Sequence, residues 1–178
     1  MLLKFELPTI ERKDQAIDYI NEFLEYDSNI NGTGGLDISD YGNWLTRTMD
    51  AHKGINIRKD RVPASTYFVF NEEDILVGMC NIRHVLSEYL ITSGSGHIGY
   101  SIRPIERRKG YATKILKEAL KILKNDFDVK EVLLGCYKDN IGSKKTILSN
   151  GGKLQREIFE ENGKITLAYT IQLKSKGE

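Results

Sequence analysis

Apolar and polar positions alternate along several short runs of the chain, and a period of two is typical of half-buried strands. Together with runs rich in β-branched and aromatic residues, this pattern predicts strands over residues 2–7, 65–71, 75–86, 97–103 and 130–138. Residues 153–174 predict a hairpin, because two strand-like runs flank the turn-forming pair Asn162 and Gly163.

Other segments repeat their apolar residues every three or four positions, as amphipathic helices do. Helices are predicted over residues 9–26 with Thr9 as the N-cap, 40–53, 111–124 and, as a short helix, within 140–152. The last of these begins near Asn140 and stops at the run Asn150-Gly151-Gly152. Residues 27–39 and 87–96 are predicted as loops, and the first is long enough to favour a functional or mobile role.

The order of these elements indicates the fold class. It is β-α-α-β-β-β-α-β-α-β-β, with no repeat, low-complexity segment or linker to divide the chain. We therefore expect a single domain over residues 1–178. Its class is α/β (α+β), with a single mixed, mostly antiparallel sheet flanked by helices. A chain of this length buries roughly 70% of its unfolded surface, so its core needs no disulfide or metal.

The balance of charge limits the classes of partner. Lys plus Arg number 26 and Asp plus Glu 25, for a formal net charge of +1. A general nucleic-acid binder would be strongly basic, so no nucleic acid is expected. Residues 1–60 hold 7 basic and 11 acidic residues, a net of −4, and the remainder carries +5. This asymmetry indicates either a cationic ligand beside an anionic one or two solvated surfaces of opposite sign.

Cys80 and Cys136 lie within apolar runs, which predicts buried free thiols in a reduced compartment. No Cys or His cluster has the spacing of metal ligands, so no metal is expected. The N-terminus lacks the apolar core of a signal peptide, and no apolar stretch approaches the ~20 residues of a membrane span. The sequence therefore predicts a soluble cytoplasmic protein that does not bind a membrane.

Two glycine patterns lie close together, and their context distinguishes them. Gly94, Gly96 and Gly99 spell G-x-G-x-x-G, a dinucleotide fingerprint that needs a strand before it and a helix at its third glycine. Here a loop precedes the pattern and a strand follows it. We therefore interpret Gly94 and Gly96 as loop glycines and Gly99 as a strand glycine.

The run RRKGYA, residues 107–112, has the opposite context: a strand leads into it and an amphipathic helix follows. The first turn of a helix exposes unpaired N–H groups and the positive end of the helix dipole, which favours an anion. Gly110 lets a phosphate approach the backbone closely, and Arg107, Arg108 and Lys109 add positive charge. The alternative is a solvated basic helix start.

The wider run IGYSIRPIERRKGYATKIL resembles motif A of the GNAT superfamily of N-acetyltransferases, in which [Q/R]-x-x-G-x-[G/A] connects a strand to a helix. Arg107, Gly110 and Ala112 fill its places. The run DNIGSKKTILSNGGKL is similar to the superfamily segment after the fifth strand, with Asn140 and Ser143 in its first two places. The order of elements also fits the GNAT-like acyl-CoA N-acyltransferase fold, and GHIGYSIRPIERRKGYA is similar to a group of bacterial predicted acetyltransferases.

The resemblance implies acetyl-CoA as co-substrate and no metal. It implies transfer of the acetyl group to a primary amine of a small molecule, peptide or protein by direct attack in a ternary complex. The alternative is a non-catalytic CoA-binding or sensing module on the same fold, and a homodimer stays open for either. The pantetheine arm would lie like an added strand between residues 99–103 and 132–137. The implied cofactor-binding residues are Ile102, Arg107, Arg108, Lys109, Gly110, Tyr111, Ala112, Thr113, Asn140 and Ser143.

The chain departs from the family pattern at the groups that move protons. The tyrosine that many members carry seven residues after the asparagine is Ile147 here. The positions at which members often carry a base are Gly96 and Ile98, so His97, which lies between them, is the candidate catalytic base. Because side chains alternate along a strand, His97 would face the wrong way unless a bulge shifts the register. The alternative is a histidine at the strand end that is satisfied by hydrogen bonds or solvent. Candidate acids, each with packing as its alternative role, are Tyr100, Tyr111 and Tyr137.

The loop over residues 27–40 lies where this superfamily usually builds its acceptor site. It holds Asp27, Asp37 and Asp40 and no basic residue. Acidic groups attract cations and raise their encounter rate. We therefore expect an acceptor amine on a positively charged small molecule or peptide. The alternative is that these aspartates only cap helices and shape turns.

Overall fold

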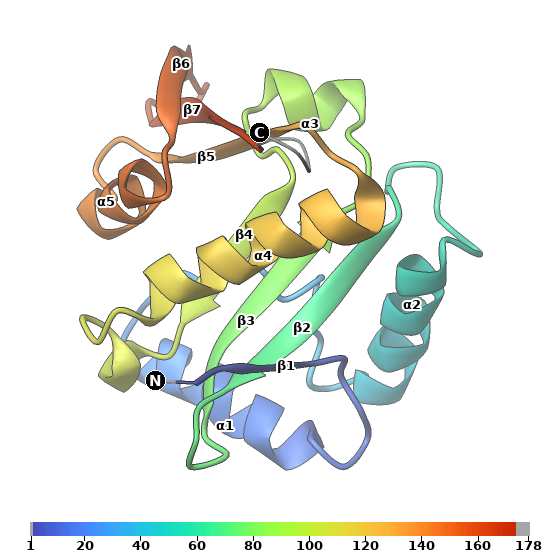
Figure 1. Cartoon of the computed structure of the whole chain (residues 1–178). Helices are drawn as coiled ribbons and strands as arrows, with labels where there is room; N and C mark the ends of the chain where they lie inside the picture. The colour runs from blue at the N-terminus through green and yellow to red at the C-terminus, as the bar shows by residue number, and fades with distance from the viewer. Residues whose placement is uncertain (1, 174–178) are drawn as a thin grey trace.

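The computed structural model describes residues 2–173, and Figure 1 shows how their elements are arranged. In chain order these are β1 (Lys4–Glu6), α1 (Lys13–Glu25), α2 (Tyr41–Lys53), β2 (Ala64–Phe70), β3 (Leu76–Arg83), α3 (Glu88–Thr92), β4 (Ile98–Ile102), the 3₁₀ turn η1 (Pro104–Glu106), α4 (Tyr111–Phe127), β5 (Glu131–Tyr137), α5 (Ile141–Ser149), β6 (Lys153–Phe159) and β7 (Ile165–Gln172). The order is the predicted one, with α3 and η1 added on either side of β4.

The strands form two hydrogen-bonded sheets where the sequence predicts one. The first has the order β1-β2-β3-β4 and the second β5-β7-β6, and all neighbours within them are antiparallel. Within residues 2–173, a single isolated bridge joins β5 to the segment before β4, from Gly96 to Leu134. The predicted class, a mixed α/β fold of antiparallel strands and flanking helices, is confirmed, and the sheet is divided where β4 meets β5.

Helices cover both faces of the first sheet (Figure 1). On one face α1 and α2 pack against β2 and β3, with Trp44 stacked on Phe68 at 6.0 Å between ring centroids. On the other face lies α4, whose Ile115 belongs to a cluster that includes Ile98 of β4 and Leu134 of β5. One core therefore joins both sheets through α4, and this packing fixes the start of α4 relative to β4 and β5.

The start of α1 differs from the prediction. The helix begins at Lys13, after Arg12, so the predicted N-cap at Thr9 is wrong. The guanidinium of Arg12 pairs with Glu6 at 3.1 Å and with Asp74 at 2.7 Å. These long-range ion pairs attach the beginning of the helix to β1 and to the β2–β3 turn, and the local sequence pattern does not reveal them.

The predicted loop 87–96 contains the short helix α3. The Ser87 side chain accepts a hydrogen bond from the Leu90 N–H and so caps this helix. A serine ahead of helix-forming residues is a capping signal. The helix has only five residues, which is too short to show a clear apolar period.

The thiols of Cys80 and Cys136 are free and buried, as predicted. No helix within residues 2–173 is long and apolar enough to cross a membrane. Over the same range, no three His, Cys, Asp or Glu side chains come together as a group that could hold a metal ion.

Candidate active site

The candidate site lies where β4 and β5 approach each other without forming a ladder. The two sheets touch at the beginning of β4, where the His97 N–H donates to the Leu133 carbonyl at 2.7 Å. Beyond this point the described residues of β4 and β5 belong to separate sheets. The two strands therefore leave two edges whose backbone groups are free of ladder partners.

The backbone of β4 shows which groups form its edge. Hydrogen-bonded pairs alternate along an antiparallel ladder. The Arg83 N–H donates to the His97 carbonyl at 2.8 Å, and the Arg103 N–H donates to the Val77 carbonyl at 2.9 Å. The odd-numbered residues therefore face β3, while Tyr100 and Ile102 direct their N–H and C=O groups away from β3, toward the second sheet.

The same alternation applies to β5. The Lys138 N–H donates to the Ile165 carbonyl of the β6–β7 hairpin at 2.8 Å, and the Leu173 N–H donates to the Lys130 carbonyl at 2.7 Å. Even-numbered residues thus pair with β7, and Gly135 directs its backbone toward β4. An extended ligand with amide groups would find partners of strand-like spacing on both edges.

The turn between β4 and α4 is shaped by two residues with positive φ. Arg108 has φ +65° and Gly110 has φ +84°, and Gly110 directly precedes Tyr111, the first residue of α4. Left-handed residues in such a turn gather successive N–H groups into an anion-binding concavity, and the first N–H groups of α4 have no acceptor within the helix. A Cβ placed on Gly110 meets no atom within 4 Å, so the space over the helix start is open.

The basic side chains of this turn do not all point at the open space. Arg107 folds back: its Nε donates to the Ile102 carbonyl at 3.2 Å and its Nη2 to the Ser28 Oγ at 2.7 Å. Lys109 Nζ lies 3.0 Å from a carboxylate oxygen of Glu106. The capacity of the turn to hold an anion therefore rests on its backbone N–H groups and on the start of α4.

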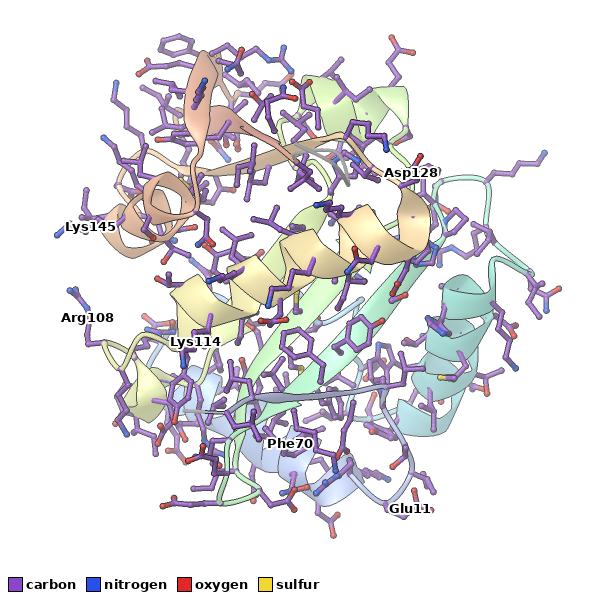
Figure 2. All side chains as sticks on the ribbon, viewed as in Figure 1. Glu11, Phe70, Arg108, Lys114, Asp128 and Lys145 are labelled. Carbon is purple, nitrogen blue, oxygen red and sulfur yellow. The ribbon has the colours of Figure 1, made fainter. Side chains whose placement is uncertain are left out.

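Helix α5 lies beside α4 and supplies the other half of the predicted cofactor site. Asn140 caps it, with its Oδ1 accepting from the Ser143 N–H at 3.0 Å. The Ser143 hydroxyl bonds the Tyr100 hydroxyl at 2.9 Å. Figure 2 shows Lys145 of α5 and Arg108 of the turn extending on the same side of the molecule. The two predicted motifs thus lie next to each other, with cations at their outer rim.

The Tyr100–Ser143 hydrogen bond bridges β4 and α5. Burial raises the pKa of Tyr100 to about 12, and the Ser143 hydrogen bond lowers it only in part. A phenol with this pKa keeps its proton at neutral pH and can donate it in a hydrogen bond. The sequence singles out both residues, Tyr100 as a candidate acid and Ser143 as an implied cofactor-binding residue. It does not predict their contact, because the two positions are 43 residues apart.

His97 lies at the junction of the two sheets with its ring turned toward β5. Its Nδ1 accepts a hydrogen bond from the Leu133 N–H at 3.0 Å. Gly96 before it has φ +60°, and a Cβ there would lie 2.1 Å from the Leu133 carbonyl oxygen, so only glycine fits. A left-handed glycine followed by a residue whose N–H and C=O point to opposite neighbours has the form of a β-bulge.

This bulge aims the histidine ring at the backbone of β5. His97 is only 7% exposed. Burial lowers the pKa of its ring, and the charge of Arg83 lowers it further. The assignment of His97 as catalytic base stays a prediction, but these contacts favour the alternative, a histidine satisfied by hydrogen bonds.

The other candidates for proton transfer occupy different environments. Ile147, which stands where many family members carry a tyrosine, is fully buried in α5. Tyr111 is packed into the core under α4. Tyr137 is 39% exposed, and Lys164 Nζ lies 4.7 Å from its ring centroid. Of the three candidate tyrosines, Tyr100 is the one with a hydrogen bond to a predicted cofactor residue.

Glu22 is a residue of the site that the sequence interpretation missed. It is 8% exposed, and its carboxylate accepts from Arg103 Nε at 2.5 Å and from the Ile105 N–H at 2.9 Å. It thereby holds the end of β4 and the 3₁₀ turn that leads into residues 107–112. One feature of the sequence could have revealed it: Glu22 is an acidic residue three positions after Tyr19, on the apolar face of a helix.

The acidic loop between α1 and α2 packs against β4. The Asn31 carbonyl accepts from the Ser101 hydroxyl at 2.6 Å, and Gly32 lies against Gly99. Asp37 accepts from the N–H and hydroxyl of Ser39, at 2.9 and 2.6 Å.

Asp40 precedes α2 and accepts from the Asn43 side chain at 2.9 and 3.1 Å. Asp37 therefore shapes a turn, as the alternative interpretation holds, whereas Asp40 stands at the N-cap position of α2 without a side-chain capping hydrogen bond. The Ser39 hydroxyl also lowers the pKa of Asp37, so this exposed carboxylate stays ionised.

Fold and site together present two strand edges without ladder partners beside the N-terminus of a helix, an arrangement suited to an extended, anionic ligand. A family profile described as "Acetyltransferase (GNAT) domain" matches residues 12–153. The chain therefore belongs to the GNAT acetyltransferase family. Membership supports acetyl transfer as its general activity. No curated protein matches the chain at a significant level.

Solved structures of the same fold include acetyltransferases with different acceptors. One is the Microcin C7 self immunity acetyltransferase MccE in complex with acetyl-CoA and AMP, at 16% identity and a TM-score of 0.71, with 96% of this chain and 92% of that one covered. Another is ribosomal-protein-S5-alanine acetyltransferase from Vibrio fischeri, at 13% identity and 0.73, with 96% and 92% covered. A third is mutant forms of the spermidine/spermine N-acetyltransferase SpeG from Vibrio cholerae, at 11% identity and 0.67, with 96% and 95% covered.

Proposed function

We propose that this chain transfers the acetyl group of acetyl-CoA to a primary amine by direct attack in a ternary complex. The observation that carries the proposal is the turn over residues 107–112. This turn lies beyond the C-terminal end of β4, and its N–H groups stand at the start of α4. Beside it are the two strand edges that have no ladder partners. A pyrophosphate and an amide-containing arm of one molecule fit this arrangement. The solved neighbour that holds acetyl-CoA supports the choice of ligand.

The proposed binding mode uses the backbone more than side chains. The pyrophosphate lies on the N–H groups of the turn and of the first turn of α4, with Asn140 and Ser143 lining the arm from α5. The pantetheine amides pair with Tyr100 and Ile102 as a peptide pairs with a sheet edge. Because the turn follows β4, the arm runs back along this strand, and the thioester comes to lie near Gly99 and Tyr100.

In the proposed reaction a neutral amine attacks the thioester carbon. The N–C bond forms, the C–S bond breaks, and the proton lost by nitrogen is balanced by the one that the thiolate gains. The Tyr100–Ser143 pair donates a hydrogen bond to the leaving sulfur. Since the pKa of Tyr100 is about 12, the phenol stabilises the thiolate and does not give up its proton to it. Because the Nδ1 of His97 already accepts from the Leu133 N–H, water takes the proton of the amine, and water also supplies the proton that the departed thiolate gains.

For the acceptor, we propose a positively charged small molecule or peptide. The support is the loop 27–40, whose carboxylates lie on the segment that packs over β4. Asp37 stays ionised while it holds its turn, so it attracts cations in either role. Among proteins of this fold, the spermidine/spermine N-acetyltransferase acts on polyamines and another acts on a ribosomal-protein alanine. An electrostatic preference would weaken with salt.

The test of the cofactor site is calorimetry of CoA binding to a Gly110→Glu protein. A carboxylate over the helix start would repel a pyrophosphate, and we expect CoA affinity to fall at least about thirtyfold. Gly54→Glu is the matched control, since Gly54 has φ +72°, also meets no atom within 4 Å and lies at the end of α2. Wild-type CoA affinity in a folded Gly110→Glu protein would contradict the proposed cradle.

The test of catalysis is a panel of cationic and neutral amines with release of free CoA as the readout. The proposed function expects CoA release with at least one amine, and a preference for cationic amines that shrinks at high salt. The alternative, a CoA-binding or sensing module, expects tight CoA binding and no release with any amine. A preference that salt does not change would contradict the cationic acceptor while leaving acetyl transfer intact.

A further inference from the structure

Arg107 has a conformation that its place in the cofactor motif does not explain. The residue stands at the first position of Arg107-x-x-Gly110-x-Ala112, yet its guanidinium turns away from the space over Gly110. It donates to the Ile102 carbonyl at 3.2 Å and to the Ser28 hydroxyl at 2.7 Å. Its central carbon also lies 5.4 Å from the ring centroid of Phe23, a cation–π distance. The side chain therefore connects β4 to the end of α1.

Each end of this connection belongs to a different half of the proposed site. Ile102 directs its backbone to the free edge of β4, where the pantetheine arm is proposed to pair. Ser28 belongs to the loop 27–40, which the acceptor amine is proposed to meet. Three residues further along, the Asn31 carbonyl accepts from the Ser101 hydroxyl at 2.6 Å, so the loop is attached to β4 a second time.

The Ser101 hydroxyl is in turn held from α1 by the Tyr19 hydroxyl at 3.0 Å. Neither of these two hydrogen bonds includes Arg107, so the second attachment is separate from the first. The Arg107 contact is the attachment that a ligand on β4 can sense, because it uses the carbonyl of Ile102 itself.

We propose that Arg107 is a positioning residue that couples occupation of the β4 edge to the order of the acceptor loop. This inference rests on the proposed function. A ligand amide that bonds Ile102 and phosphates that immobilise residues 108–113 together restrict the Arg107 backbone and its carbonyl partner. The guanidinium then holds Ser28 more firmly, and the first part of the loop, residues 27–31, opens less often.

The experiment is amide hydrogen exchange of residues 27–40, with and without saturating CoA. CoA should slow exchange over residues 27–31 of the wild type about fivefold or more, the lower end of usual coupling between sites. Arg107→Gln is the informative variant, because the motif accepts glutamine at this place but the shorter side chain offers no second donor that reaches Ser28. At a CoA concentration that saturates the variant, the CoA-dependent slowing should be lost.

Three further proteins make the result specific. Ser28→Ala removes the same contact from the loop side and should also lose the slowing. The double variant Arg107→Gln/Ser28→Ala should lose no more of the CoA-dependent slowing than either single variant, because the two substitutions remove the same contact. Arg58→Gln, on an exposed arginine that pairs with nearby Asp60, is the control for loss of a positive charge and should behave as wild type.

The outcomes separate the inference from the function on which it rests. If CoA fails to bind the wild type, the proposed function fails. If CoA binds and Arg107→Gln keeps the slowing over residues 27–31, the coupling role is wrong while the function stands. If Arg107→Gln loses more than about tenfold in CoA affinity but keeps the slowing at saturation, Arg107 contacts the cofactor itself and the inference is overturned.

Discussion

Replacing Glu22 should show how strongly α1 holds the turn over residues 107–112 in place. Its carboxylate makes two contacts, with Arg103 Nε at 2.5 Å and with the Ile105 N–H at 2.9 Å. The side chains of the ion pair are only 10% and 17% exposed, so solvent screens them weakly. Glu22→Gln keeps an oxygen for Ile105 but removes the negative charge opposite Arg103.

The size of the effect follows from these two contacts. A hydrogen bond to a charged group contributes about 1.5–3 kcal/mol, and leaving a largely buried charge without its partner adds to the loss. Part of that loss is recovered because the amide oxygen still accepts from Arg103 or Ile105. We therefore expect Glu22→Gln to lower the free energy of unfolding by about 1–3 kcal/mol, which is about 2–12 °C in Tm for a chain of this size.

The consequence for function is a displaced turn, because Arg103 and Ile105 lead directly into residues 107–112. CoA affinity should fall about tenfold in the folded variant. The assays are denaturant unfolding and calorimetry with CoA. A double-mutant cycle with Arg103→Gln should give a coupling energy of about 1–2 kcal/mol.

Glu118→Gln is the matched control, since Glu118 pairs with Lys121 on the exposed side of α4, with side chains 41% and 54% exposed. A pair of this kind contributes about 0–1 kcal/mol. Should Glu22→Gln unfold and bind CoA like the wild type, with no coupling to Arg103, the reasoning that α1 positions the turn would be refuted.

Two further predictions concern histidines. In His97→Asn, the amide oxygen can replace Nδ1 as acceptor for the Leu133 N–H, so we expect CoA release to stay within about threefold of wild type with an unchanged pH profile; a loss of about 10²-fold together with a missing ionisation would instead identify His97 as the base. His84 Nε2 and His52 Nδ1 each lie 2.8 Å from the Ser65 hydroxyl, and burial, followed by the charge of His52, lowers the pKa of His84 below 6.5. As the pH falls, the unfolded chain therefore binds a proton at this histidine before the folded chain does. The stability that neutral His84 contributes is present above about pH 6.5 and is lost as the pH falls below it. Thermal melts at pH 7.5 and 5 should therefore show a smaller acid-induced drop in Tm for His84→Gln than for wild type, in which His97 contributes with the same sign; an equal drop in both proteins would contradict this account.

The sequence predicts the parts of this site that depend on neighbouring residues. The apolar period places α4, and the glycine before it marks the turn, because both signals lie within one short segment. The Asn140 cap is predictable for the same reason, since its acceptor reaches the Ser143 N–H three residues on. Local backbone geometry carries this information, so a single sequence is enough to find it.

Contacts between distant segments are what the sequence does not show. The division of the sheet depends on where β4 stops pairing with β5, and a period of two is the same for a paired and an unpaired strand. Glu22 and Arg103 are 81 residues apart. An acidic residue on a helix is usually exposed to solvent, so the sequence does not predict that Glu22 has a buried partner. The ring of His97 could be placed only once the bulge at Gly96 was known.

The loop over residues 27–40, which we propose meets the acceptor, divides into a part attached to β4 and a part that is not, and this division bears on the proposed specificity. Its first part is attached to β4 and to the cofactor turn, through Ser28, Asn31 and Gly32. At Gly35, by contrast, an added Cβ would meet no atom within 4 Å, and Asp37 bonds only its own turn through Ser39. Changes in residues 28–32 would therefore disturb the proposed cofactor and acceptor sites together, because these residues share contacts with β4. Within residues 35–39, Leu36 packs against the core formed by α1, α2, β2 and β3, whereas Gly35 has open space beside it and Asp37 bonds its own turn. The choice of the proposed acceptor amine is therefore most freely adjusted at Gly35 and Asp37.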